Sequence, residues 1–278
     1  MDTSTPGYFS ERGFTLVELL IAIAISGLIM TALFAFFWTQ ENTANTQQGV
    51  ALMQGDLAVA AQMLTQDIRM ARYNPREDTR LPHETCARDF APAFQTGVSF
   101  NTNTPGCQAA TDTPVTTDAT NLAFVSDRDA NGRISGSDTP LEQIAYRFQA
   151  RVAGELSGRL QRYNPNPSGG IDTWPDVMQN VDGVEFLYQL NGGTFTCRPT
   201  AAQLNDIDAV WVTILARGEQ PTKRYTNTEN YAEQRASRGR IDSADHTCDL
   251  VADNFNGGAP YNDGFRRQLL TFTVQCRN

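Results

Sequence analysis

Residues 127–138 have the types and spacing of a calcium-binding loop. Alternating oxygen ligands can converge on one ion, and Gly132 permits the sharp turn between them. The candidate ligands are Asp127, Asp129, Asn131, the backbone carbonyl of Arg133, and Asp138. Asp138 stands where such loops place a longer, bidentate Glu, and the flanking residues are typical of strands. A solvated turn between two strands is therefore the alternative to a Ca²⁺ site.

The carboxylate of Glu18 is a second group that could do chemistry. It is the only charge among the 25 residues from Phe14 to Trp38. A helix of this length crosses the ~30 Å apolar core of a membrane, where a carboxylate is costly and normally marks function. The run is too long for a secretory signal and lacks its small-residue cleavage site. A plain signal anchor remains the alternative, but it explains neither Glu18 nor Gly13 at the start of the apolar run.

The same helix is predicted to continue beyond the membrane. Residues 39–48 are polar without proline, and apolar residues then recur every three or four positions, which predicts one buried stripe. The stripe consists of Val50, Met53, Leu57, Ala60, Leu64, Ile68 and Ala71. The helix is expected to end near Tyr73, because Asn74 precedes Pro75. A coiled coil is the alternative for this second half.

The remaining chain is predicted to form loops and an antiparallel sheet, giving an α+β fold. Residues 75–120 contain five prolines and a Thr-rich run, which indicates loop. Strand-like segments occupy residues 122–125, 144–148, 156–163, 184–190, 194–197, 210–216 and 269–276. Asn191-Gly192-Gly193 is typical of a hairpin turn. We expect a meander with one face on the long helix.

Composition limits the possible functions. The chain has 278 residues and a formal net charge of −9, which argues against binding to nucleic acid. No P-loop, GxSxG, HExxH or Cys–His–Asp pattern is present, so we expect no enzymatic activity. Zinc is not expected either, because His83 and His246 are far apart and no two cysteines are close in sequence.

The segment ERGFTLVELLIAIAI resembles the amino-terminal signal of type IV prepilins and of type II secretion pseudopilins. The resemblance implies cleavage after Gly13 by a prepilin peptidase and N-methylation of Phe14. It also implies that Glu18 pairs with the terminal amine of a neighbouring subunit, which makes a buried charge tolerable. Residues 32–35 lack the helix-kinking proline usual in major pilins, which argues against a bulk filament subunit.

Further segments resemble PilW-type minor pilins: LTQDIRMARYN, DRDANGRI, EQIAYRF, NVDGVEFLY and the tail FRRQLLTFTVQCRN. The resemblance implies a type IV pilin-like fold in four parts. These are a leader (residues 1–13), a transmembrane half-helix (14–38), an amphipathic half-helix (39–74) and a periplasmic or extracellular domain (75–278). The implied location is the inner membrane, spanned once with a cytoplasmic amino-terminus, and then the pilus fibre.

The implied role is pilus assembly or initiation, at the pilus tip. The implied partners are other minor pilins, the major pilin, the prepilin peptidase and the inner-membrane assembly platform. A GspJ-like minor pseudopilin is the alternative within this group. An adhesin or DNA-uptake module belongs to another class, and its candidate surface is the long segment of residues 218–265.

The five cysteines suggest two disulfides, because a translocated domain is in an oxidising compartment. Cys86 and Cys107 share the loop region and are the favoured first pair. Cys276 is in register with apolar residues of the last strand, where the resemblance implies an aliphatic residue. It is therefore expected to be a buried thiol, which leaves Cys197 to pair with Cys248.

Overall fold

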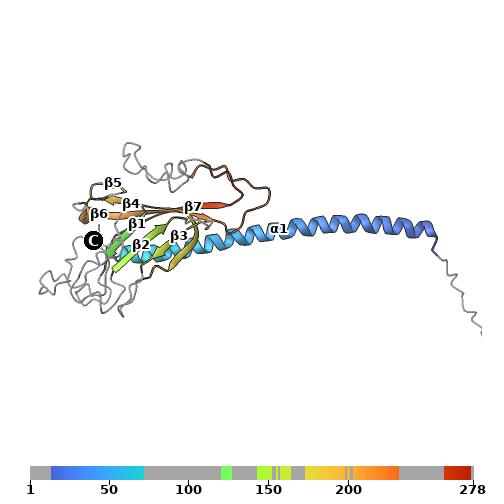
Figure 1. Cartoon of the computed structure of the whole chain (residues 1–278), viewed down its shortest axis with the longest axis horizontal. Coiled ribbons are helices and arrows are strands. Elements are labelled where there is room, and N and C mark those ends of the chain that lie inside the picture. Colours follow the sequence, from blue (N-terminus) through green and yellow to red (C-terminus); the bar gives the residue numbers. More distant parts are fainter. Residues whose placement is uncertain are drawn as a thin grey trace, which may run out of the picture. The chain divides into compact units, whose positions relative to one another are not determined.

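A computed structural model describes residues 14–71, 120–126, 143–151, 155, 157–163, 173–197, 199–200, 203–231 and 260–276. Within these residues one helix comes first, and seven strands and a short 3₁₀ helix follow it (Figure 1). They are α1 (Leu16–Arg69), β1 (Asn121–Val125), β2 (Gln143–Gln149), β3 (Gly158–Arg162), β4 (Asp176–Leu190), β5 (Phe195–Thr196), η1 (Leu204–Asp206), β6 (Ile207–Arg217) and β7 (Arg267–Gln275).

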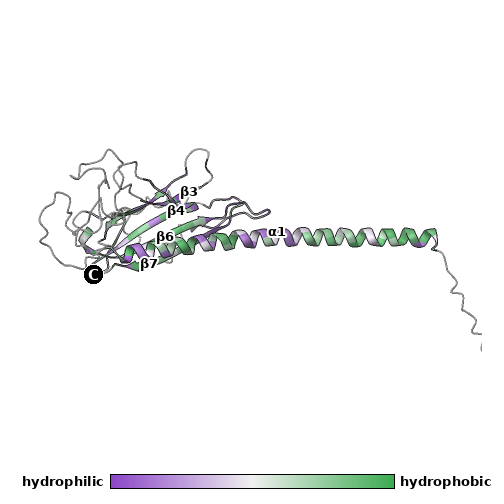
Figure 2. Ribbon diagram, turned by 90° about the horizontal axis from the view of Figure 1, so that it is seen from below, coloured by the Kyte–Doolittle hydropathy of each residue, from purple (hydrophilic) through white to green (hydrophobic). Residues whose placement is uncertain are grey.

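On the side of α1 shown in Figure 2, the amino-terminal part is mostly apolar, whereas polar and apolar residues alternate farther along. Its large side chains are exposed as far as Trp38, and the helix is long and apolar enough to cross a membrane. The polar side chains bond within the helix. The hydroxyls of Thr31 and Thr39, for example, donate to the carbonyls of Gly27 and Ala35 at 2.8 and 2.9 Å. These bonds satisfy the hydroxyls without any outside partner.

The second half of α1 packs on the sheet. The chain divides into two compact units at Gln48 and Gly49, and the second unit holds this half-helix and all the strands. Six of the seven predicted stripe residues are buried, and Val50 is half-buried. The stripe is therefore confirmed. The helix ends at Arg69, earlier than predicted, because Met70 and Ala71 donate to the carbonyls of Asp67 and Ile68 and so tighten the last turn.

The strands form one antiparallel sheet in the order β1-β2-β3-β4-β6-β7, with β5 paired to the end of β4. All seven predicted strands are present, so the helix-on-sheet α+β architecture is confirmed. The start of β4 at Asp176 was missed, because residues 176–183 contain Asp, Asn and Gly, which strands usually avoid. Pairing with β3, in which Leu160 lies opposite Met178, overrides that preference.

The predicted hairpin turn is also confirmed. Gly192 and Gly193 have φ angles of +90° and +83°, which only glycine adopts without strain. The amide of Gly193 donates to Leu190, and the amide of Leu190 donates to Thr194, which closes the loop between β4 and β5. Gln189 then lies opposite Phe195.

The main core lies between α1 and one face of the sheet, here called the helix face. It combines the α1 stripe with alternating residues of six strands, including Phe124, Tyr146, Phe186 and Val212. A smaller cluster covers the opposite, outer face and contains Leu187, Leu215, Tyr231 and Leu269. The sheet is therefore apolar on both faces at its centre.

We predict that Leu64→Ala lowers the free energy of unfolding of the full chain in detergent by about 2–5 kcal/mol. Leu64 is fully buried, so the substitution leaves a cavity between α1 and the sheet. Leu52→Ala is the matched control, because Leu52 lies on the same helix and is 58% exposed. Denaturant titration measures both variants. Equal losses would contradict the packing of the stripe on the sheet.

Candidate functional site

The start of α1 forms a capping box around Glu18. Thr15 precedes the first helical residue, and both its amide and its hydroxyl donate to the carboxylate of Glu18, each at 3.0 Å. The amide of Glu18 in turn donates to the Thr15 hydroxyl at 3.3 Å. This reciprocal pattern satisfies donors that a helix start otherwise leaves open.

The capping box holds the Glu18 carboxylate at the positive end of the helix dipole, a favourable place for negative charge. A carboxylate has about four lone-pair positions, so it can accept a further donor while it caps the helix. Glu18 and Phe14 are both exposed, and Phe14 is 85% exposed. The site can therefore receive a cation or an apolar surface from outside the chain.

The sequence interpretation singled out Glu18 but missed Thr15. The signature Thr-x-x-Glu before an apolar run would have predicted the cap. Gly13 lies outside the described residues, so the structure does not test the cleavage position.

Asp67 joins the helix to the sheet by a buried polar contact. Its carboxylate accepts a hydrogen bond from the hydroxyl of Tyr146 in β2 at 2.5 Å. It also accepts one from Nε of Arg162 in β3 at 2.8 Å. The side chains of Asp67 and Arg162 are only 8% and 15% exposed. This triad fixes the position of the end of α1 along the sheet.

The triad also shifts proton equilibria. Burial, followed by the charge of Asp67, raises the pKa of Tyr146, so its phenol stays protonated and remains a donor. Burial alone would lower the pKa of Arg162, but the Asp67 carboxylate raises it on balance. Arg162 is therefore held in its charged form. Asp67 is buried beside Leu64 and Ile68 of the stripe, and the sequence pattern gives no sign of its partners in β2 and β3.

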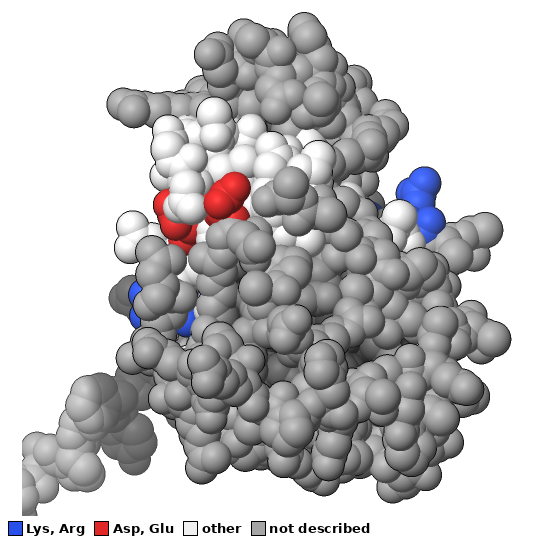
Figure 3. All heavy atoms as spheres, turned by 90° about the vertical axis from the view of Figure 1, so that its left-hand side faces the viewer, with Lys and Arg blue, Asp and Glu red and all other residues white. Residues whose placement is uncertain are grey.

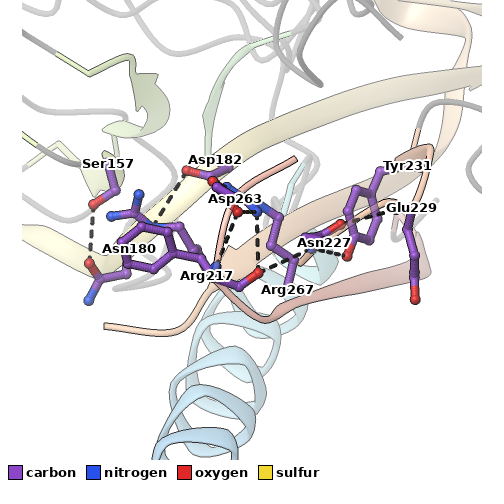
Figure 4. Close-up of polar contacts among 10 residues, drawn as sticks. Ser157, Asn180, Asp182, Arg217, Asn227, Glu229, Tyr231, Asp263 and Arg267 are labelled. Carbon is purple, nitrogen blue, oxygen red and sulfur yellow. Dashed lines mark hydrogen bonds and ion pairs between the residues drawn. The ribbon is translucent and has the colours of Figure 1, made fainter. Parts of the chain in front are cut away.

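A second ionic cluster on the outer face centres on Arg267, the first residue of β7 (Figure 4). Its Nε donates to Asp182 in β4 at 2.6 Å. Its two terminal nitrogens donate to the two oxygens of Asp263 at 2.6 and 2.7 Å. The guanidinium also stacks on the Tyr261 ring, 3.6 Å from the centroid. Arg217, at the end of β6, approaches Asp182 at 4.0 Å.

The cluster anchors both ends of the segment between β6 and β7. The amide of Asn227 donates to the Asp263 carbonyl at 2.7 Å, and the amide of Asn262 donates to the Asn227 carbonyl at 2.8 Å. The Asn227 side chain also donates to the hydroxyl of Tyr231 at 2.9 Å. The described ends of the candidate binding segment are therefore tied to each other and to the sheet.

The two carboxylates that bind Arg267 respond in opposite ways. Burial raises the pKa of Asp182, and the charge of Arg267 offsets only part of that effect. Hydrogen bonds from Arg267 lower the pKa of Asp263, which is more accessible to water. Acid would thus protonate Asp182 before Asp263, and the bidentate contact with Asp263 would persist.

The other predicted sites are only partly described. Cys197 is buried and disulfide-bonded, and Cys276 is a buried thiol packed with the main core. Both pairings, Cys86–Cys107 and Cys197–Cys248, stay predictions because Cys86, Cys107 and Cys248 lie outside the described residues. The candidate calcium ligands Asp127, Asp129, Asn131, Arg133 and Asp138 also lie outside them.

Charge on the described surface is mixed. On the face shown in Figure 3, the described Lys and Arg side chains lie in separate places, and acidic side chains stand close to one another. Within the described part of this face there is no continuous basic surface of the kind that binds phosphate backbones.

Comparison with known proteins identifies the amino-terminus. Residues 9–34 match a family model described as the prokaryotic N-terminal methylation motif. Among solved structures, the type IV-like pilin TTHA1219 from Thermus thermophilus is similar at 13% identity and a TM-score of 0.39. The similarity covers 80% of this chain and 96% of that one. No curated protein matches the chain. The chain therefore carries a prepilin-type methylation motif, as the sequence predicted.

We predict that Asp67→Asn lowers the free energy of unfolding by about 3–5 kcal/mol, because it leaves the Arg162 charge buried without its counter-ion. Asp56→Asn is the matched control, since Asp56 is exposed on the same helix. That change should stay within about 0.5 kcal/mol of the wild type. Denaturant titration of the full chain in detergent compares the two. A loss no larger than that of the control would show that the triad does not stabilise the fold.

Proposed function

We propose that this chain is a minor pilin of the PilW type that takes part in assembly or initiation of a type IV pilus. The observation that carries the proposal is the methylation motif at residues 9–34, which includes the start of an apolar helix whose large side chains are exposed from Leu16 to Trp38. Such a helix needs either lipid or neighbouring helices around it. A pilin occupies both environments in turn, first as a membrane protein and then as a fibre subunit.

The capping box supports the proposed role of Glu18. Cleavage after Gly13 would place a new terminal amine on Phe14, next to Thr15. The exposed carboxylate of Glu18, oriented by Thr15, can pair with the terminal amine of a neighbouring subunit while its cap is retained. This pairing, among the packed helices of the fibre, would offset the cost of the Glu18 charge in an apolar environment.

The described domain is consistent with a position at the fibre tip. It places a seven-stranded sheet behind one half-helix, and the segment between β6 and β7 is anchored by the Arg267 cluster. A GspJ-like pseudopilin has the same amino-terminal requirements and remains the alternative. An adhesive or DNA-uptake role would instead use the surface of the anchored segment, residues 218–265.

We predict that Gly13→Val blocks maturation, because a branched side chain next to the scissile bond would obstruct the peptidase. The unprocessed precursor should accumulate, and a gel of membrane fractions would resolve it from the mature chain by the mass of the leader. Gly7→Val is the control, because it changes a glycine of the leader away from the cleavage position. Normal maturation of the Gly13 variant would rule out a prepilin.

We predict that Glu18→Ala is processed normally but is at least about tenfold depleted from sheared pili, because the neighbour's amine loses its partner. Glu41→Ala, which removes an exposed carboxylate from the same helix, should be incorporated normally. Surface pili and protein secretion are assayed in parallel. Wild-type incorporation of the Glu18 variant would refute the assembly role, and loss of secretion with intact pili would favour a pseudopilus.

A further inference from the structure

Among the described strands, β7 lies at the edge of the sheet and pairs with β6 alone. The direction of its backbone groups follows from the bonds at its two ends. The amide of Gly218 donates to the Arg266 carbonyl, and the amide of Cys276 donates to the Asp208 carbonyl, both at 2.8 Å. Since no register shift separates these ends, all even-numbered residues of the strand face β6.

The odd-numbered residues therefore direct their N–H and C=O groups away from β6. They are Arg267, Leu269, Thr271, Thr273 and Gln275. Among the described residues, no backbone hydrogen bond joins these groups to another segment. Within the described part of the chain, β7 thus presents a row of open donors and acceptors along its whole length.

This edge lacks the features that normally keep edge strands from pairing. Residues 268–275 contain no charge, proline or glycine, and the pairing with β6 has no bulge. The β3–β4 and β4–β6 pairs, in contrast, both contain register shifts. A long, regular and uncharged edge is a ready template for pairing with a strand of another chain.

The side chains of β7 define what such a strand must be. On the helix face, Leu270 and Phe272 are only partly buried against the core. On the outer face, Thr273 and Gln275 are exposed and Thr271 is half-buried. A matching strand would alternate apolar residues on the helix face with uncharged polar residues on the outer face.

A second copy of this chain meets the chemical requirement but not the geometric one. Antiparallel pairing of two β7 strands centred on Thr271 has a two-fold axis perpendicular to the sheet, which reverses the direction of α1 between the copies. Each chain enters its helix from the membrane-spanning segment that precedes Gly49. The two chains would therefore enter from opposite ends, which one membrane does not permit.

We infer that the open edge of β7 accepts an extended, uncharged, alternately apolar segment of a different subunit of the same fibre, through backbone pairing. This inference rests on the proposed function. It adds a lateral contact through the sheet to the contact through the helix. It also assigns the recognition to the amides of the odd-numbered residues.

Amide hydrogen exchange tests the inference directly. In the purified full chain in detergent, the amides of Leu269, Thr271 and Thr273 should exchange fast, and those of Leu270, Phe272 and Val274 slowly. In isolated fibres that contain the chain, the first group should slow by about tenfold or more. Fast exchange of that group in fibres would overturn the inference and leave the pilin assignment intact. Absence of the chain from fibres would overturn both.

Thr273→Pro removes one outward amide without breaking a bond to β6, and proline is tolerated at such edge positions. It should keep the melting temperature of the control Thr273→Val, which retains the amide, yet be at least about tenfold depleted from fibres. If the proline variant does not fold, Thr273→Lys tests the same edge with a charge. Incorporation equal to that of the control would overturn the inference. So would a dimer of the purified chain that protects the same amides.

Discussion

The structure depends on one packing constraint, the burial of a narrow stripe of α1 against the helix face of the sheet. The two halves of the helix suit different environments. Large apolar side chains of the first half are exposed, whereas the second half buries only the stripe of residues from Met53 to Ala71. The hydrophobic effect is non-directional, so burial of apolar area alone does not fix the position of the helix along the sheet. The hydrogen bonds of Asp67 fix that position, because its carboxylate accepts from both Tyr146 and Arg162.

The two ionic clusters join different parts of the fold. The Asp67 triad joins the helix to two strands and lies in the main core, where one lost partner leaves a buried charge. The Arg267 cluster joins β4, β7 and the segment before β7 on the outer face, and Arg267 binds two carboxylates, those of Asp182 and Asp263. Because Arg267 has two partners, the loss of one leaves its guanidinium still paired with the other.

The sequence predicted the elements that have strong periodicity. The α1 stripe, the strands and the glycine hairpin all follow from local spacing. Boundaries were missed at the start of β4 at Asp176, where strand pairing overrides preference, and at the end of α1 at Arg69, where the last turn tightens. Contacts between residues distant in sequence, such as Asp67 with Arg162 or Asp182 with Arg267, leave no periodic signal. Thr15 differs, because its capping signature was present and local. For the candidate site, the sequence thus located Glu18, and the structure shows that Thr15 orients its carboxylate.

The same periodicity that makes β7 predictable leaves its edge able to pair with another strand. Alternation of Leu270, Phe272 and Val274 with threonines builds a strand that packs well on one side and leaves five residues with outward backbone groups. A single charge or proline at Thr271 or Thr273 would protect this edge at little cost to the core, because both side chains lie on the outer face. Their absence is explained if the edge is a contact surface. The same unpaired N–H and C=O groups that promote aggregation of a single protein can pair a subunit with its neighbour.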